Sequence, residues 1–168
     1  CSMKDVDPTK HLGEVMSTGG RKPVTVPEKL DKDIAWLIGA VAGDGYIDGS
    51  SVHLSGSCEE LKERFDKIIS QKFGRTTSYL ERDDGVWTIT LNSKAIADIL
   101  TDFFGIPAEN KARNLRMPKI GLPDDLLASY IRGLFDTDGS VNCRNNSEGS
   151  SCIEYYTASD ELATEIHT

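Results

Sequence analysis

Two short segments of this 168-residue chain are predicted to be helices that end in the same way, and this pair limits the possible folds more than any other feature. The segments are LIGAVAGDG (residues 37–45) and IRGLFDTDG (residues 131–139). Each carries two small residues four positions apart, which places both on one helix face. These are Gly39 and Gly43 in the first segment, and Gly133 and Thr137 in the second. We therefore expect the two helices to pack closely, with their C-terminal ends together.

Hydrophobic periodicity divides the chain into three parts. Residues 1–26 contain glycines and prolines without a sustained period, which indicates a linker or N-terminal arm. Residues 27–123 are predicted to form a helix, two strands, a helix, two strands and a closing helix, followed by a connector. Asp31 and Ser93 are the predicted caps of the first and third helices. The order αββαββα predicts a mixed α+β fold (α/β in content) around one core.

The same order begins again in residues 124–168. A helix starts at Asp124 or Asp125 and ends at the second Asp-Gly, two strand-like segments follow, and Ser159 is placed to cap a further helix. The chain therefore contains an internal repeat, a pseudo-two-fold pair joined at the two packed helices. The second copy stops before its second hairpin and closing helix, so we expect it to be truncated.

Both predicted helices end in an acidic residue, Asp44 and Asp138. The C-terminal end of a helix carries partial negative charge that disfavours a carboxylate, and two facing carboxylates also repel each other. A bound divalent cation would relieve both effects, and oxygen-only ligands favour Mg²⁺ (or Mn²⁺) over Zn²⁺. Asp-Gly after a helix is also a common cap and turn. Two copies at equivalent places nevertheless favour a metal site, of the kind that hydrolyses phosphodiester bonds.

The two segments resemble the nine-residue LAGLIDADG motif, and residues 27–168 resemble the LAGLIDADG homing endonucleases, in particular the domains inserted in inteins. The resemblance implies that the motif helices form the interface between two pseudo-symmetric halves, and that the last acid of each motif holds the catalytic metals. The implied metal site consists of Asp44 and Asp138 with the neighbouring Gly43 and Thr137. Asp136 matches the family's earlier acid, but the equivalent position is Ala42, so we assign Asp136 no catalytic role.

Intein endonucleases carry a short proline-containing block before the second motif, and RMPKI, around Pro118, resembles it. In the family this block supplies a catalytic lysine a few residues before the proline, where this chain has Leu115. Other basic residues of the segment are therefore the candidates for this role. They are, in this order, Lys111, Arg113, Arg116 and Lys119, and the two lysines are the candidate catalytic residues.

Family members place paired strands in the DNA major groove, a groove that admits strands and exposes base edges to them. The resemblance thus implies double-stranded DNA as the partner. The candidate contacts lie on or beside the predicted strands and in the connector: His53, Arg75, Arg82, Thr88, Thr90, Arg113, Arg116 and Arg144. Each is also compatible with a solvated strand residue, because a one-residue register error reverses the face.

The acidic composition is the strongest argument against a DNA partner. Net charge is −8 and the isoelectric point is near 4.9, whereas neutralising phosphates requires Lys and Arg. Local basic patches matter more than the sum, and an acidic surface is also expected in a high-salt cytoplasm. No segment is apolar enough for a membrane helix, and the four cysteines lack the spacing of a zinc site or disulfide framework. We expect an intracellular protein, in the cytoplasm or nucleoid, without membrane association.

Three functions remain open. The first, favoured because both acids are present, is a site-specific homing endonuclease that hydrolyses double-stranded DNA with Mg²⁺, as the domain of an intein or as a free-standing mobile element. The second is a non-cleaving DNA-binding or regulatory protein on the same fold, which loss of either acid would have favoured. The third is a protein-interaction domain in which the paired helices form only a dimer interface. An intein splicing domain, or the remainder of a parent chain, is a further candidate partner.

Overall fold

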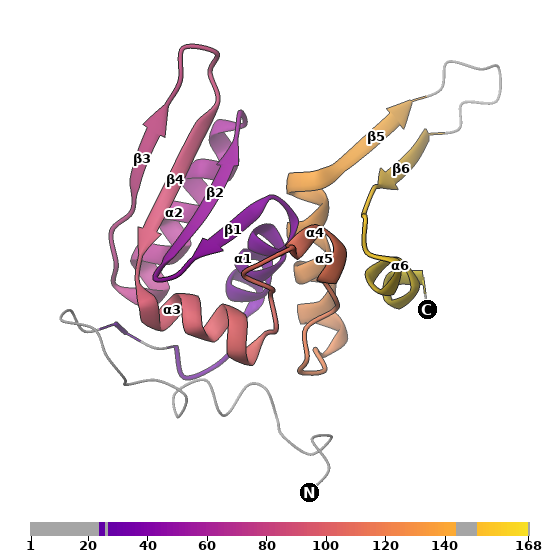
Figure 1. The fold of residues 1–168 in the computed structure, drawn as a ribbon, viewed down its shortest axis with the longest axis horizontal. Helices are drawn as coiled ribbons and strands as arrows, with labels where there is room; N and C mark the ends of the chain where they lie inside the picture. The colour runs from indigo at the N-terminus through magenta and orange to yellow at the C-terminus, as the bar shows by residue number, and fades with distance from the viewer. Residues whose placement is uncertain (1–23, 26, 144–150, 168) are drawn as a thin grey trace, which may run out of the picture.

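The computed structural model describes residues 24–25, 27–143 and 151–167 (Figure 1). Its elements are α1 (Lys32–Gly43), β1 (Gly45–Asp48), β2 (Ser51–Gly56), α2 (Glu59–Phe73), β3 (Ser78–Glu81), β4 (Trp87–Asn92), α3 (Lys94–Asp98), the π-helical turn η2 (Ile99–Phe103), α4 (Lys111–Asn114), α5 (Asp124–Asp138), β5 (Gly139–Cys143), β6 (Ser151–Tyr155) and α6 (Asp160–His167). The predicted mixed α+β fold is confirmed. Arg144 and almost all of the predicted arm lie outside the described residues, so the predictions for them stay predictions.

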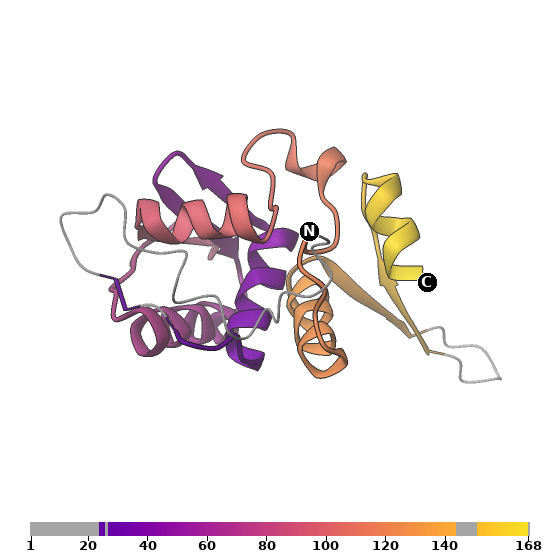
Figure 2. The ribbon, with the colours of Figure 1, turned by 90° about the horizontal axis from the view of Figure 1, so that it is seen from below.

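α1 is the central helix of the fold. Asp31 caps it as predicted, because its Oδ1 accepts hydrogen bonds from the backbone N–H groups of Asp33 (3.1 Å) and Ile34 (3.0 Å). Every residue of positions 34–43 is buried. A helix that is apolar on all sides needs neighbours on all sides. The strands, α2 and α5 supply them (Figures 1 and 2).

The first four strands form one antiparallel sheet in the order β1-β2-β4-β3. Two of the predicted strands, β3 and β4, pair as a hairpin that turns at Gly85, whose φ of +78° is easy only for glycine. Side chains alternate along β2 and β4, so one face meets the helices. That face carries Val52, Leu54, Trp87, Ile89 and Leu91, all buried. The polar residues of the same strands therefore lie on the opposite, outward face.

The second part of the chain packs on the other side of α1. α5 lies along α1, and β5, β6 and α6 lie beyond it, away from the four-stranded sheet (Figure 2). Ser159 caps α6 as predicted, because its Oγ accepts a hydrogen bond from the N–H of Leu162 at 3.1 Å. The same hydroxyl donates to the carbonyl of Leu115 at 2.6 Å, and Leu162 is fully buried. The connector before α5 is thereby held against α6.

Ser93 stands at the N-cap position of α3 as predicted, but its side chain makes no capping hydrogen bond. Its backbone N–H donates to the carbonyl of Ser50 at 2.9 Å. The sheet, rather than a cap, therefore fixes where α3 begins. No helix in the described residues is long and apolar enough to cross a membrane.

Candidate active site at the paired helix ends

α1 and α5 approach each other backbone to backbone. A Cβ added to Gly39 would lie 2.9 Å from the carbonyl carbon of Tyr130 and 3.2 Å from the Cα of Gly133. A Cβ added to Gly133 would lie 2.7 Å from the backbone nitrogen of Ala40. Neither position has room for a side chain, because the obstacle is the backbone of the facing helix. One turn further on, Gly43 faces the side chain of Thr137.

The two helices bring their last acids to the same end of the pair. Asp44 follows α1 and Asp138 is the last residue of α5, and each is followed by a glycine that begins a strand. A Cβ on Gly45 or Gly139 would lie 2.6 Å and 2.9 Å, respectively, from the Cα four positions earlier. Glycine is needed because the chain folds back against the last helical turn as it enters the strand. The Asp-Gly pair thus fixes where each carboxylate leaves its helix.

Lys111 lies at the C-terminal end of α1. It begins α4 after Asn110, whose φ of +50° is a conformation that asparagine adopts more readily than most residues. Its Nζ donates to the backbone carbonyl of Val41 at 3.2 Å and, more closely, to those of Gly43 and Gly45. An ammonium group there satisfies carbonyls that the helix leaves unpaired and opposes the negative end of its dipole. A residue from the connector therefore completes the end of α1.

Asp44, Asp138 and Lys111 form one charged cluster. Burial raises the pKa of Asp44, the charge of Asp138 raises it further, and Lys111 opposes both effects. Burial also raises the pKa of Asp138, again against Lys111. Burial lowers the pKa of Lys111, which the two acids oppose. Both acidic residues nevertheless remain exposed to solvent.

Two carboxylates are too few to enclose a metal ion that takes all its ligands from the protein. They are enough for Mg²⁺ or Mn²⁺, which keep water and substrate oxygens as ligands. No three His, Cys, Asp or Glu side chains converge on a metal position in the part of the chain described here. Mg²⁺ is commonly held by one or two carboxylates, with water and substrate phosphate completing its shell. Of the other two predicted ligands, the Gly43 carbonyl accepts a hydrogen bond from Lys111. The Thr137 hydroxyl donates to two carbonyls of its own helix, at 3.0 and 3.1 Å, and its side chain lies in the helix contact.

Comparison with protein families identifies the fold. Residues 31–105 and 125–168 match the family model described as a LAGLIDADG-like domain. The chain belongs to the LAGLIDADG family. The two matched ranges contain both motif helices and the strands that follow them.

Similar proteins cover most of this LAGLIDADG chain but are much longer. A probable translation initiation factor of Methanocaldococcus jannaschii is 32% identical over 145 residues, which is 83% of this chain and 12% of that protein. A subunit of the A-type ATP synthase of Methanopyrus kandleri is 28% identical, covering 83% of this chain and 13% of its own length. An uncharacterized protein of M. jannaschii is 29% identical, covering 95% and 20%. The LAGLIDADG chain thus spans a fifth or less of each of these relatives.

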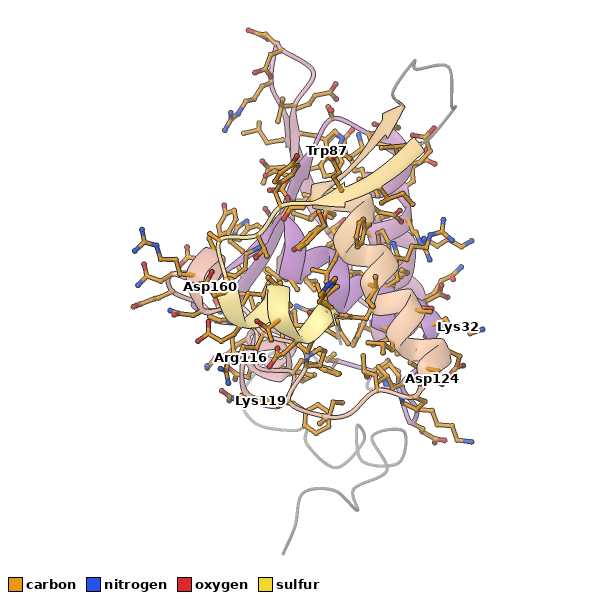
Figure 3. The ribbon with its side chains drawn as sticks, turned by 90° about the vertical axis from the view of Figure 1, so that its right-hand side faces the viewer. Lys32, Trp87, Arg116, Lys119, Asp124 and Asp160 are labelled. Carbon is orange, nitrogen blue, oxygen red and sulfur yellow. The ribbon has the colours of Figure 1, made fainter. Side chains whose placement is uncertain are left out.

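Lys119 and Arg116 lie away from the LAGLIDADG acids. The side-chain carbons of Lys119 rest on Gly105, where an added Cβ would come within 2.8 Å of Cγ and Cε. Arg116 pairs with Glu161 of α6 at 3.6 Å, and Figure 3 shows Arg116 and Lys119 near each other at this end of the molecule. Arg113 is exposed on α4. Of the two candidate lysines, the structure brings Lys111 to the acids and leaves Lys119 in the connector.

Three predicted DNA contacts share the outward face of the sheet: His53, Thr88 and Thr90. His53 Nδ1 lies 3.0 Å from Thr90 Oγ1, and the ring of Tyr46 stacks on the imidazole with centroids 4.3 Å apart. Ser55 and Thr88 hydroxyls are 2.8 Å apart. Burial lowers the pKa of His53, against the charge of Asp48, so the imidazole is neutral at neutral pH. This face therefore offers hydrogen-bonding groups and a flat ring stack rather than positive charge.

The two predicted strand-region arginines differ in accessibility. Arg82 is exposed at the turn between β3 and β4. Arg75 donates through a terminal guanidinium nitrogen to the carbonyl of Asn92 at 2.7 Å, which ties the end of α2 to the end of β4. Leu80 pairs with Thr88 in the sheet and is 70% exposed, so a large apolar side chain also lies on the outward face. Arg82 is free to reach a partner, whereas Arg75 already supports the fold.

Sequence reasoning missed Tyr46, Ser55 and Tyr155. The alternation of β1 and β2 would have found the first two, because both share a face with His53. Tyr155 ends β6 and packs on Phe135 of α5 with ring centroids 5.2 Å apart. Burial and the charge of Asp138 raise the pKa of Tyr155 to about 12. No local signal marks Tyr155, because β6 meets α5 only through tertiary packing.

Proposed function

We propose that this chain is the DNA-cleaving domain of a site-specific homing endonuclease that hydrolyses both strands of DNA with Mg²⁺ or Mn²⁺. One observation carries the proposal: two helices packed through glycine bring Asp44 and Asp138 to a common end, beside the ammonium group of Lys111. A merely structural helix pair has no need of two exposed acids, one of which raises the pKa of the other. Family membership adds that relatives of this fold act on DNA.

The proposed roles follow from the chemistry of each side chain. Asp44 and Asp138 would hold the divalent cation, which supplies a Lewis acid for the phosphodiester and lowers the pKa of a bound water. Lys111 would stabilise negative charge that develops on the phosphate, because its ammonium is held by the carbonyls at the end of α1 and interacts electrostatically with both acids. The outward sheet face, with His53, Thr88 and Thr90, would lie in the major groove.

The relatives support an origin within inteins. Their names describe a translation factor and part of an ATP synthase, proteins with no common activity, and the similar region is a small share of each. A domain inserted into unrelated host proteins explains this distribution. We propose that this chain is such an inserted endonuclease domain, and that an intein splicing domain accompanies it in the parent protein.

Crystals soaked in Mn²⁺ test the proposed metal site directly. We expect anomalous density bound by the carboxylates of Asp44 and Asp138, because hard oxygen ligands select this type of cation. Density at either acid supports the nuclease. Carboxylates that point apart without metal, in a protein that still binds duplex DNA, would instead identify a non-cleaving DNA-binding protein on the same fold.

The Lys111→Met substitution tests the proposed role of the lysine. We expect cleavage of duplex DNA to slow by about a hundredfold, since a positioned charged or proton-transferring group contributes on this order. The same change at Lys119 examines the other candidate, and Lys94→Met on α3, far from the acids, is the control. Rates are measured on a pool of duplexes by capture of the cleaved ends. A rate for Lys111→Met equal to that of Lys94→Met would remove Lys111 from the mechanism.

A further inference from the structure

The carboxylate of Asp136 joins three helices. Its Oδ2 accepts a hydrogen bond from Nε1 of Trp36 in α1 at 2.8 Å and lies 3.4 Å from Nε of Arg132, one turn earlier in α5. Arg64 of α2 lies 3.8 Å from the same oxygen, and its guanidinium stacks over the Trp36 ring at 4.1 Å. Four side chains from α1, α2 and α5 thus form one cluster, which we call the Asp136 cluster: Trp36, Arg64, Arg132 and Asp136.

This cluster provides a directional contact that the glycine packing lacks. Gly39 and Gly133 allow a close approach, but their smooth surfaces resist sliding or rotation of one helix on the other only weakly. A hydrogen bond is directional, and a charged acceptor strengthens it. Trp36 is 0% exposed, so an unpaired indole N–H would be costly. The bond between Trp36 and Asp136 therefore favours one register of α5 against α1.

The hydrogen bond between Trp36 and Asp136 forms on one side of the pair of helices α1 and α5. At the motif position of Asp136, α1 carries Ala42, and at the position of Trp36, α5 carries Tyr130. Ala42 has no acceptor, so an equivalent side-chain bond cannot form across the other side. Asp136 lies two residues before Asp138. A displacement of the hydrogen bond between Trp36 and Asp136 would therefore move Asp138 relative to Asp44.

We propose that Asp136 is a positioning residue that, through Trp36, fixes the register of α5 on α1 and hence the separation of Asp44 and Asp138. The catalytic consequence rests on the proposed nuclease function, because that function assigns the metal to the two acids. The register itself is a property of the helix pair and is measurable without any cleavage.

A cysteine pair across the helix contact measures the register. An added Cβ at Gly43 lies 3.3 Å from the Cβ of Thr137, near the separation of about 3.8 Å that a disulfide requires. Gly43→Cys and Thr137→Cys are introduced together, with the natural cysteines Cys1, Cys58, Cys143 and Cys152 replaced by serine. We expect Trp36→Phe and Asp136→Leu to slow oxidative cross-linking by at least about fivefold, since each removes the hydrogen bond between Trp36 and Asp136. Asp136→Asn, which retains an acceptor, should cross-link at the parent rate.

Trp87→Phe is the matched control for Trp36→Phe. Trp87 is also buried, at 1% exposure, but its Nε1 has no hydrogen-bond partner among the described residues. The two substitutions therefore remove the same atoms, and only the one at Trp36 removes a hydrogen bond. Equal cross-linking rates for these two variants would overturn the positioning role.

Cleavage kinetics in the natural-cysteine background provide the second readout. Trp36→Phe should lower kcat by about tenfold to a hundredfold, because a displacement of about 1 Å at a reacting centre costs this much. KM should stay unchanged, since the outward sheet face is untouched, and Asp136→Asn should keep the kcat of the parent protein. If the variants cross-link more slowly but the parent protein does not cleave DNA, the positioning role stands and the nuclease function is rejected. Unchanged cross-linking and kcat in a cleaving protein would reject the positioning role alone.

Discussion

Replacing Asp44 with asparagine is expected to slow DNA cleavage by at least about a hundredfold and to leave the Kd for duplex DNA within about twofold. Asparagine keeps the shape of the side chain but removes the charge that would hold a divalent cation, and several kcal/mol of transition-state stabilisation depend on that cation. The outward sheet face does not include Asp44, so binding should persist. Single-turnover cleavage with Mg²⁺ gives the rate, and fluorescence anisotropy without Mg²⁺ gives the Kd.

Two related variants make the Asp44 experiment specific. Asp138→Asn should cause a loss of the same order, and the double variant little more, because residues that act as one unit are not additive. Asp98→Asn is the control, since Asp98 lies on α3 and pairs with Lys94 at 2.9 Å. If Asp44→Asn cleaved as fast as Asp98→Asn, the acid pair would not be the active site.

The Gly39→Ala substitution is expected to destabilise the protein by about 3 kcal/mol or more, at the upper end of the usual cost of overpacking. The added methyl group would meet the backbone of Tyr130 and Gly133, which cannot rotate aside as a side chain would. The helices would have to separate along their whole contact. For a protein of this size the corresponding fall in Tm is about 6–12 °C. Thermal unfolding followed by circular dichroism measures it.

Gly121→Ala is the matched control for Gly39→Ala. A Cβ at Gly121 meets no atom of the described residues within 4 Å, and Gly121 lies in the connector outside any helix or strand. Its Tm should stay within a degree or two of the parent protein, since surface substitutions without new contacts change stability little. Equal Tm values for the two variants would show that α1 and α5 do not pack as closely as the structure has them.

Much of the fold was predictable because its signals are local. The cap at Asp31 depends on residues two and three positions away, and the turn at Gly85 depends on its own φ. Ser93 also stands at the predicted N-cap of α3, but the missing side-chain bond was not predictable, because Ser93 contacts Ser50, which is distant in sequence.

The candidate site was only partly accessible from the sequence. The repeated Asp-Gly signal predicts Asp44 and Asp138 from the sequence alone, since each copy of the signal lies within nine residues. It could not choose between Lys111 and Lys119, which lie in the same connector and have equal charge. The folding of α4 over the end of α1 makes that choice.

The sequence by itself determined the order of helices and strands, the two motif helices and the pair of acids, because periodicity, caps and small-residue spacing act within a few residues. Only the tertiary structure decided that Lys111 reaches the acids, that Tyr46 stacks on His53, and that the otherwise unassigned Asp136 bonds to Trp36. The last contact joins residues 100 positions apart. Contacts of this kind depend on how the whole core packs, and no local pattern encodes that packing.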